Sequence, residues 1–229
     1  SLNGKEMTLL DVGGGAGMIL KEVSRRIEGD FGIKVNKISL DLSPGALDVQ
    51  RRTNPDLRKA LNEDIRATSL KTKEVDLTLV IDVLEHVPSP DLALMEIGRV
   101  SKFVLLKLPL ENNLYSNFAN ILTRGRYRRR IVEQIGHINY YDLKGLLGDI
   151  EKNCGRTVDW QLHNAFEEGF RSEQYEGWNI RQRFPYIVGR YVYKLSPRLC
   201  SLIFTDHIGV LVDCYGAPLG ESGGMTARM

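Results

Sequence analysis

The sequence reads Met7-Thr-Leu-Leu-Asp-Val-Gly-Gly-Gly-Ala-Gly17 near its N-terminus, where an apolar run ends in a carboxylate and closely spaced glycines. A short apolar run of this kind is typical of a buried strand in a parallel sheet. Glycine is needed where a backbone turns with positive φ and approaches a ligand closely. Beyond the glycines, Leu20, Val23 and Ile27 fall on one face of a helical pattern. The stretch therefore predicts a strand, a ligand-binding turn and a helix.

The spacing of these glycines distinguishes between two kinds of ligand. A dinucleotide-binding turn has the pattern Gly-x-Gly-x-x-Gly, and counting from Gly13 its last glycine would stand at Met18. Here the glycines are Gly13, Gly15 and Gly17, and Asp11 precedes them. A carboxylate beside the turn matches a pyrophosphate poorly and a ligand with an ammonium group well. A nicotinamide-dependent oxidoreductase remains an alternative.

Apolar runs and helical patterns alternate along the rest of the chain, which favours a parallel sheet with flanking helices. Further strands are expected at residues 34–40, 58–61, 75–83, 102–108, 157–162 and 207–214, and helices at 17–27, 43–52, 91–101 and 142–153. The segments 109–138 and 166–204 are expected to be insertions that form a lid and shape a pocket. We predict a single domain over residues 1–215 and a loose tail over 216–229.

The composition restricts the partners of the protein. The formal net charge is only +2, from 31 Lys+Arg and 29 Asp+Glu, which does not favour a general nucleic-acid binder. No stretch reaches about 18 uncharged apolar residues, so we expect no membrane span, and no signal segment is recognised. The cysteines Cys154, Cys200 and Cys214 are too far apart in sequence to suggest a metal or redox motif. We expect a cytoplasmic monomer or homodimer without a bound metal.

Acidic residues recur where the first four strands end. Asp11 closes the first strand, Asp41 the second and Asp64 follows the third, while the fourth leads into Asp82-Val-Leu-Glu-His-Val-Pro88. In this order the motifs resemble the cofactor site of class I S-adenosylmethionine-dependent methyltransferases, particularly the small-molecule branch of the type 11/23 methyltransferases. The resemblance covers about residues 7–154. It implies a Rossmann-like, seven-stranded, mostly parallel sheet with helices on both faces, a three-layer αβα sandwich whose last strand is antiparallel.

The resemblance also implies a role for each matching residue. S-adenosylmethionine would be the cofactor and S-adenosylhomocysteine the product. The expected cofactor-binding residues are Asp11, Gly13, Gly15, Gly17, Asp41, Leu42, Asp64, Ile65, Asp82, Val83 and His86. The glycines would lie under the methionine portion and Asp11 near its amino group, while Asp41 would accept hydrogen bonds from both ribose hydroxyls. Asp64 and Ile65 would meet the adenine. Singly, each carboxylate is equally compatible with a turn or a solvated charge, and the order of the motifs favours the cofactor site.

Two histidines are candidates for catalysis. Methyl transfer requires the acceptor atom, the methyl group and the sulfur in line, and a hydroxyl acceptor would be helped by a general base. His86 follows the fourth strand, and His137 lies in Gly136-His-Ile-Asn-Tyr-Tyr141, which resembles the acceptor side of sugar and quinone methyltransferases. Each could instead have a packing or capping role. The expected acceptor is a sugar, quinone-like molecule or other metabolite, methylated on oxygen or nitrogen.

Other assignments stay open at this point. Arg124–Arg130 holds five arginines in seven positions and could contact an anionic acceptor or RNA, or form a solvated lid face. The alternatives are therefore an RNA methyltransferase that uses this cluster and a cofactor-binding module without catalysis. About six residues precede the first strand, so either the sequence is trimmed or the cover over the cofactor comes from elsewhere, such as the 109–138 insertion.

Overall fold

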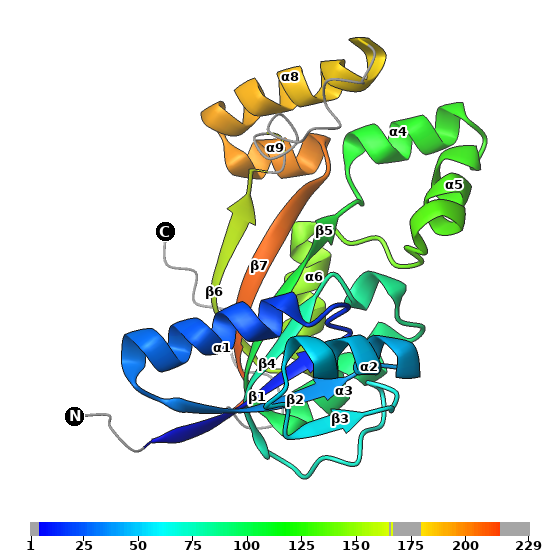
Figure 1. Cartoon of the computed structure of the whole chain (residues 1–229). Helices are drawn as coiled ribbons and strands as arrows, with labels where there is room; N and C mark the ends of the chain where they lie inside the picture. The colour runs from blue at the N-terminus through cyan, green and yellow to red at the C-terminus, as the bar shows by residue number, and fades with distance from the viewer. Residues whose placement is uncertain (1–4, 165, 167–179, 216–229) are drawn as a thin grey trace.

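The structure, a computed structural model, describes residues 5–164, 166 and 180–215. These residues form a seven-stranded sheet with the strand order β3-β2-β1-β4-β5-β7-β6 (Figure 1). The strands are β1 (Glu6–Val12), β2 (Lys34–Leu40), β3 (Lys59–Leu61), β4 (Val75–Ile81), β5 (Ser101–Leu110), β6 (Arg156–His163) and β7 (Asp206–Asp213). The first five strands pair in parallel, and β7 runs antiparallel between β5 and β6. The predicted fold class is confirmed.

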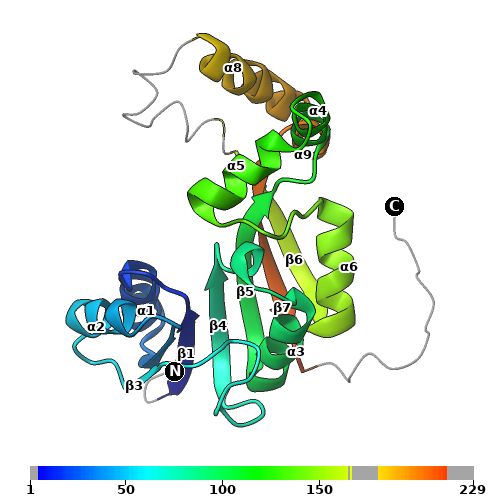
Figure 2. The same cartoon turned by 90° about the vertical axis from the view of Figure 1, so that its right-hand side faces the viewer.

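Helices cover both faces of the sheet (Figure 2). One face carries α1 (Met18–Phe31) and α2 (Pro44–Thr53), and the other carries α3 (Pro90–Val100) and α6 (Leu143–Asn153). Local sequence explains where these helices begin and end. The Ser43 hydroxyl accepts a hydrogen bond from the Ala46 amide at 3.2 Å, and Pro44 occupies the first turn of α2. Gly32 ends α1 in the left-handed region, with φ 64°.

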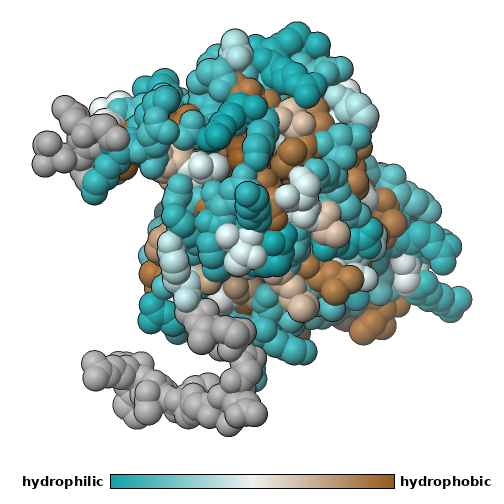
Figure 3. Space-filling model, turned by 90° about the horizontal axis from the view of Figure 1, so that it is seen from below, coloured by the Kyte–Doolittle hydropathy of each residue, from teal (hydrophilic) through white to brown (hydrophobic). Residues whose placement is uncertain are grey.

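The core follows from strands that are buried on both faces. On one side, Leu9, Leu20, Val35 and Leu79 form a cluster beneath α1. A larger cluster lies on the other side and extends through β4, β5 and β7 to α3 and α6. Within the sheet, the buried hydroxyls of Thr78 on β4 and Ser101 on β5 pair with each other at 2.6 Å. On the face shown in Figure 3, hydrophilic residues predominate and hydrophobic ones form separate patches.

The predicted insertions are helical where the structure describes them. They contain α4 (Leu114–Leu122), α5 (Arg126–Ile135), α8 (Ile180–Leu195) and α9 (Pro197–Ile203). These helices gather beyond the end of β5 (Figures 1 and 2). Residues 167–179 of the second insertion and the predicted tail, 216–229, lie outside the described residues. Within the described part of the chain, no helix has the length and apolar character needed to cross a membrane.

One predicted strand boundary is wrong in a way that matters for the site. The sequence pattern extends the fourth strand to Val83, whereas β4 ends at Ile81. Asp82 adopts φ 53°, in the left-handed region, and this turns the chain away from the sheet. A short 3-10 helix, η1 (Leu84–His86), follows. The turn places the side chains of η1 at the edge of the sheet instead of in another strand.

Candidate functional site

The site lies where the order of the strands reverses. From β1 the chain proceeds through β2 and β3 on one side, and β4 and β5 lie on the other. Ligands of open α/β sheets bind at such switch points, outside the carboxyl ends of the strands. A cavity of about 300 Å³ lies at this point, at the lower end of the range of small-molecule sites. Its lining residues are Val12, Gly13, Leu40, Asp41, Leu42, Glu63, Asp64, Ile65, Arg66, Val83, His86, Val87 and Pro88.

The glycine turn between β1 and α1 is held tightly and leaves one position open. Gly13, Gly15 and Gly17 have φ values of 60°, 53° and 74°, which side chains rarely adopt. A Cβ at Gly13 would lie 2.9 Å from a methyl group of Val83, and one at Gly17 would lie 2.7 Å from Nδ2 of Asn54. A Cβ at Gly15 would meet no atom within 4 Å. The turn therefore packs against the protein at both ends and faces open space in the middle.

Asp11 is a buried carboxylate beside this turn. It is 1% exposed, and its Oδ2 atom has no hydrogen-bond partner among the described residues. A Cβ on Gly14 would lie only 1.9 Å from that oxygen, so the carboxylate is pressed against the backbone of the glycine turn. Burial, and then the charge of Asp41, raise the pKa of Asp11 to about 7. A cationic group bound at the turn would supply the missing partner.

The turn after β2 is fixed from two sides. Oδ1 of Asp41 accepts a hydrogen bond from the Ser43 amide at 2.9 Å. The side chain of Asn62 donates to the carbonyls of Asp41 and Leu42, at 3.0 and 2.9 Å. Asp41 and Leu42 line the cavity, and the Leu42 side chain is 70% exposed. A ligand in the cavity would thus meet the carboxylate of Asp41 on a backbone segment that these hydrogen bonds already hold in place.

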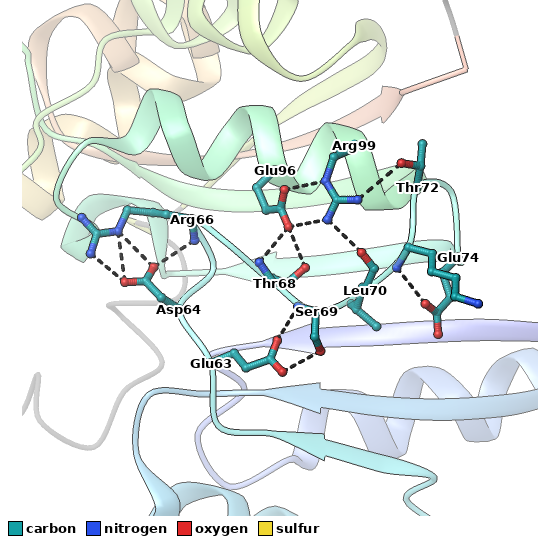
Figure 4. Close-up of polar contacts among 11 residues, drawn as sticks. Glu63, Asp64, Arg66, Thr68, Ser69, Leu70, Thr72, Glu74, Glu96 and Arg99 are labelled. Carbon is teal, nitrogen blue, oxygen red and sulfur yellow. Dashed lines mark hydrogen bonds and ion pairs between the residues drawn. The ribbon is translucent and has the colours of Figure 1, made fainter.

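Asp64 meets a residue that the sequence analysis missed. Its Oδ2 atom accepts a hydrogen bond from Nη2 of Arg66 at 2.6 Å, and the ion pair lowers the pKa of Asp64 (Figure 4). Arg66 also donates to the carbonyl of Pro88 at 3.3 Å, which ties the β3–β4 connection to the residues after η1. Ile65, between the two, is 6% exposed. At this end the cavity therefore presents a carboxylate that is already paired.

Further along the same connection, a second set of polar contacts holds the backbone in place. The carboxylate of Glu96 accepts hydrogen bonds from the amide and hydroxyl of Thr68 at 2.8 and 2.7 Å (Figure 4). Arg99 binds the same carboxylate at 2.7 Å and donates to the carbonyl of Leu70 at 2.8 Å. Glu96 and Arg99 belong to α3, so this helix anchors the segment that carries Asp64.

Of the predicted residues after β4, Val83 and His86 line the cavity. Asp82 is not among the lining residues, and its carboxylate forms a 2.7 Å ion pair with Nζ of Lys107 on β5. The remaining cofactor candidates outside the lining are Asp11, Gly15 and Gly17, which belong to the glycine turn and the strand before it. The structure thus brings most of the predicted cofactor residues together around one cavity.

The segment after α5 packs onto η1. The side chain of Asn139 donates to the carbonyls of Leu84 and Val87 at 3.0 and 2.8 Å. The amides of Ile138 and Asn139 both donate to the carbonyl of Glu85, at 2.9 and 3.0 Å. These bonds bring the two candidate catalytic histidines side by side, although they are far apart in sequence. The ring centroids of His86 and His137 lie 4.7 Å apart, with an interplanar angle of 77°.

Two glutamates that the sequence analysis did not select complete this cluster. Nδ1 of His137 lies 2.8 Å from Oε2 of Glu111, which directly follows β5. Glu85 is 1% exposed, and neither of its carboxylate oxygens has a hydrogen-bond partner in the described part of the chain. Burial raises the pKa of Glu85 to about 7. The position of Glu111 at the end of a central parallel strand was the one sequence signal that could have identified it.

The arginine cluster does not act as one surface. Arg128 donates to Oδ1 of Asn117 at 2.6 Å, and its guanidinium carbon lies 4.5 Å from the centre of the Tyr140 ring. The other arginines of the cluster are more open to solvent: Arg124, Arg126, Arg129 and Arg130. Arg128 therefore helps to hold α5 against α4, and the remainder of the cluster faces solvent.

Comparison with known proteins finds a family model that matches part of this chain and solved structures with a similar fold. Residues 10–103 match a family model described as a methyltransferase domain. A protein from Galdieria sulphuraria, assigned as a sarcosine dimethylglycine methyltransferase, has a similar fold, with a TM-score of 0.61 and 15% identity over 93% of this chain and 80% of that one. A protein from Bacillus halodurans assigned as a methyltransferase gives 0.58 and 13%, over 93% and 94% of the two chains.

A third similar structure contains a bound ligand. Geranyl diphosphate C-methyltransferase from Streptomyces coelicolor, solved with S-adenosyl-L-homocysteine, gives a TM-score of 0.59 and 13% identity over 92% of this chain and 70% of that one. No curated protein sequence matches this chain. At these identities the similarity establishes the fold and leaves the reaction to be argued from the site.

Proposed function

We propose that this chain, which has the fold of the class I S-adenosylmethionine-dependent methyltransferases and matches the methyltransferase-domain family over residues 10–103, methylates a small or medium-sized acceptor. The cofactor, when bound, supplies an electrophilic methyl group on a sulfonium. The protein has to bind the cofactor, orient the acceptor and exclude water.

The observation that carries this proposal is the unpaired, buried carboxylate of Asp11 beside an open glycine turn. A buried polar group without a partner calls for one that is not part of the chain. The cofactor ends in an amino acid, whose ammonium group provides positive charge and donors for Asp11. Gly15 leaves the space that the ligand needs. The Asp11 carboxylate and the open space at Gly15 therefore fit the amino-acid end of S-adenosylmethionine.

The other cavity residues fit the remaining parts of the same ligand. We assign the ribose to Asp41, because the two oxygens of a carboxylate match two neighbouring hydroxyl donors. We assign the adenine to the end of the cavity with Asp64 and Ile65. Arg66 stays paired with Asp64 in this assignment, so an exocyclic amino group would share the carboxylate with the guanidinium.

On the acceptor side, we propose that His137 and His86 face the reacting atom. Nδ1 of each ring lies next to an oxygen that can only accept, the carboxylate of Glu111 or the carbonyl of Gly136. Each neutral ring is therefore protonated at Nδ1 and carries its lone pair at Nε2. A hydroxyl acceptor could give its proton to such an atom, and His137, held by Glu111, is the better oriented of the two.

Isothermal titration calorimetry with Asp41→Ala tests the cofactor assignment. Losing two hydrogen bonds to a charged group, at about 1.5–3 kcal/mol per bond, should weaken S-adenosylhomocysteine binding by about 10²- to 10⁴-fold. Asp48→Ala is the matched control, because that carboxylate lies on the exposed side of α2, where it forms a 3.3 Å ion pair with Arg51. Equal affinities of the two variants would remove Asp41 from the site.

An acceptor screen then separates an enzyme from a binding module. Release of S-adenosylhomocysteine with a sugar, quinone-like or amine acceptor supports the enzyme, and His137→Ala should then lower kcat by about 10²–10⁴-fold if the residue acts as a base. Cofactor binding without turnover on any acceptor class would favour the non-catalytic module.

A further inference from the structure

We propose that Glu85, His86 and His137 form a binding site for a divalent transition-metal ion such as Zn²⁺. In the part of the chain that the structure describes, this is the one group of three candidate metal ligands whose ligand atoms all lie within 4.8 Å of one another. Two imidazoles and one carboxylate form a set found in both zinc and non-haem iron sites.

The first argument is the orientation of the two imidazoles. A histidine that binds a metal through one nitrogen usually donates a hydrogen bond from the other to a carboxylate or a backbone carbonyl. His137 has Glu111 at 2.8 Å from Nδ1, and His86 has the carbonyl of Gly136 at 3.1 Å from Nδ1. In both rings Nδ1 therefore has the kind of hydrogen-bond partner that metal-binding histidines have, and Nε2 is left available to bind an ion.

The second argument is the state of Glu85. Both of its carboxylate oxygens are buried and lack a hydrogen-bond partner among the described residues. Oε1 of Glu85 lies 4.0 Å from Nε2 of His137, so the unpaired carboxylate faces the free imidazole nitrogen. A bound cation would supply the missing partner for both groups.

The distances allow an ion after a small adjustment. Ligands at 2.0–2.2 Å from a tetrahedral ion lie about 3.3–3.6 Å apart, so the side chains have to converge by about 1 Å. His86 is exposed and provides a route from solvent. The backbone of the site is held by Asn139 and by the amides that donate to the carbonyl of Glu85. Only side-chain movement is therefore required.

The site adjoins the cofactor cavity, since His86 lines both. Three protein ligands leave coordination positions for water or for an acceptor atom. With an ion bound, Nε2 of His137 is a ligand and no longer accepts a proton, so the metal-bound and metal-free proteins would activate an acceptor differently. Metal binding itself is independent of the proposed methyl transfer and can be measured without cofactor.

The experiment is a titration of the purified protein, without a histidine tag, with Zn²⁺ by calorimetry and with Co²⁺ by visible absorption. We expect one equivalent of either ion per chain. Glu85→Gln and His86→Ala should each abolish stoichiometric binding. Glu111→Gln removes the carboxylate behind His137 and should weaken binding by about 10- to 100-fold.

His163→Ala is the matched control, because this histidine is exposed on β6 and lies outside the cluster. It should bind the ion as the unaltered protein does. Circular dichroism establishes that each variant is folded. Glu85→Gln preserves the shape of its side chain and keeps the test decisive if His86→Ala fails to fold. No binding by the unaltered protein, or unchanged binding by Glu85→Gln and His86→Ala, would overturn the proposal. Calorimetric binding of S-adenosylhomocysteine to the same samples tests the proposed function separately.

Discussion

Replacing Asp11 with asparagine should change how the stability of the protein depends on pH. The pKa of this carboxylate is raised by burial from its ordinary value of 3.8 to about 7 in the folded protein. Between these pH values the folded protein keeps a proton that the unfolded chain has lost. The free energy of unfolding therefore falls as pH rises from about 4 to about 7, and the loss is complete above that range.

The size of the effect follows from the two pKa values. At about 1.4 kcal/mol for each pH unit, the loss amounts to about 4 kcal/mol. An asparagine side chain cannot ionise and keeps a similar shape, so the variant should lack this loss. Relative to the unaltered protein, Asp11→Asn should gain about 4 kcal/mol in the free energy of unfolding on going from pH 4 to pH 8.

Urea unfolding of both proteins across this pH range, without cofactor, measures the difference directly. Other groups that titrate, including Glu85, are present in both proteins and cancel. Asp48→Asn, at an exposed position on α2, should give a curve parallel to that of the unaltered protein. If the Asp11→Asn curve is also parallel, Asp11 is ionised at little energetic penalty and our account of its burial is wrong.

Three further predictions concern packing and the glycine turn. Gly98→Ala should destabilise the protein by about 1–3 kcal/mol in urea unfolding, because the added Cβ would lie 2.5 Å from the carbonyl oxygen of Cys154. Gly148→Ala is the control, because a Cβ at this position in α6 meets no atom within 4 Å. This control variant should be as stable as the unaltered protein or more stable by up to about 1 kcal/mol. Gly15→Ala should weaken S-adenosylhomocysteine binding in calorimetry, because the added methyl group would occupy the open space beside the turn. The free energy of unfolding should fall by only about 1–2 kcal/mol, the penalty for a side chain at φ 53°. Unchanged affinity would place the ligand elsewhere. Asn139→Ala should lower the free energy of unfolding by about 1–3 kcal/mol, because the carbonyls of Leu84 and Val87 lose their donor, and a change below about 0.5 kcal/mol would contradict this role for the side chain.

Much of the fold could be predicted because its signals are local. The apolar run before Gly13 and the glycine spacing specify a strand and a turn within about ten residues of chain. Serine and proline at 43 and 44 mark the start of α2, as the structure confirms. The prediction failed at Asp82, where a non-glycine residue adopts a left-handed conformation inside an otherwise continuous apolar pattern. Such a turn leaves little trace in residue type.

The gathering of several predicted cofactor residues around one cavity could also be expected from sequence, because parallel strands bring their carboxyl ends to one edge. Asp41, Asp64 and Val83 therefore line a common cavity, as their positions after consecutive strands indicate. That logic could not foresee the ion pair between Arg66 and Asp64, which depends on the path of a loop.

The meeting of His86, His137 and Glu111 was decided by tertiary structure. His137 and Glu111 are separated by 26 positions, and His86 and Gly136 by 50, so no local pattern couples them. Their meeting depends on how α4 and α5 return the chain to η1, where Asn139 holds it. The unusual pKa values of Asp11 and Glu85 likewise arise from burial. Residue types and their spacing along the chain specified the strands, the glycine turn and the acidic residues at the strand ends, whereas long-range packing alone determined which charges lost their contact with water and which side chains came to face one another.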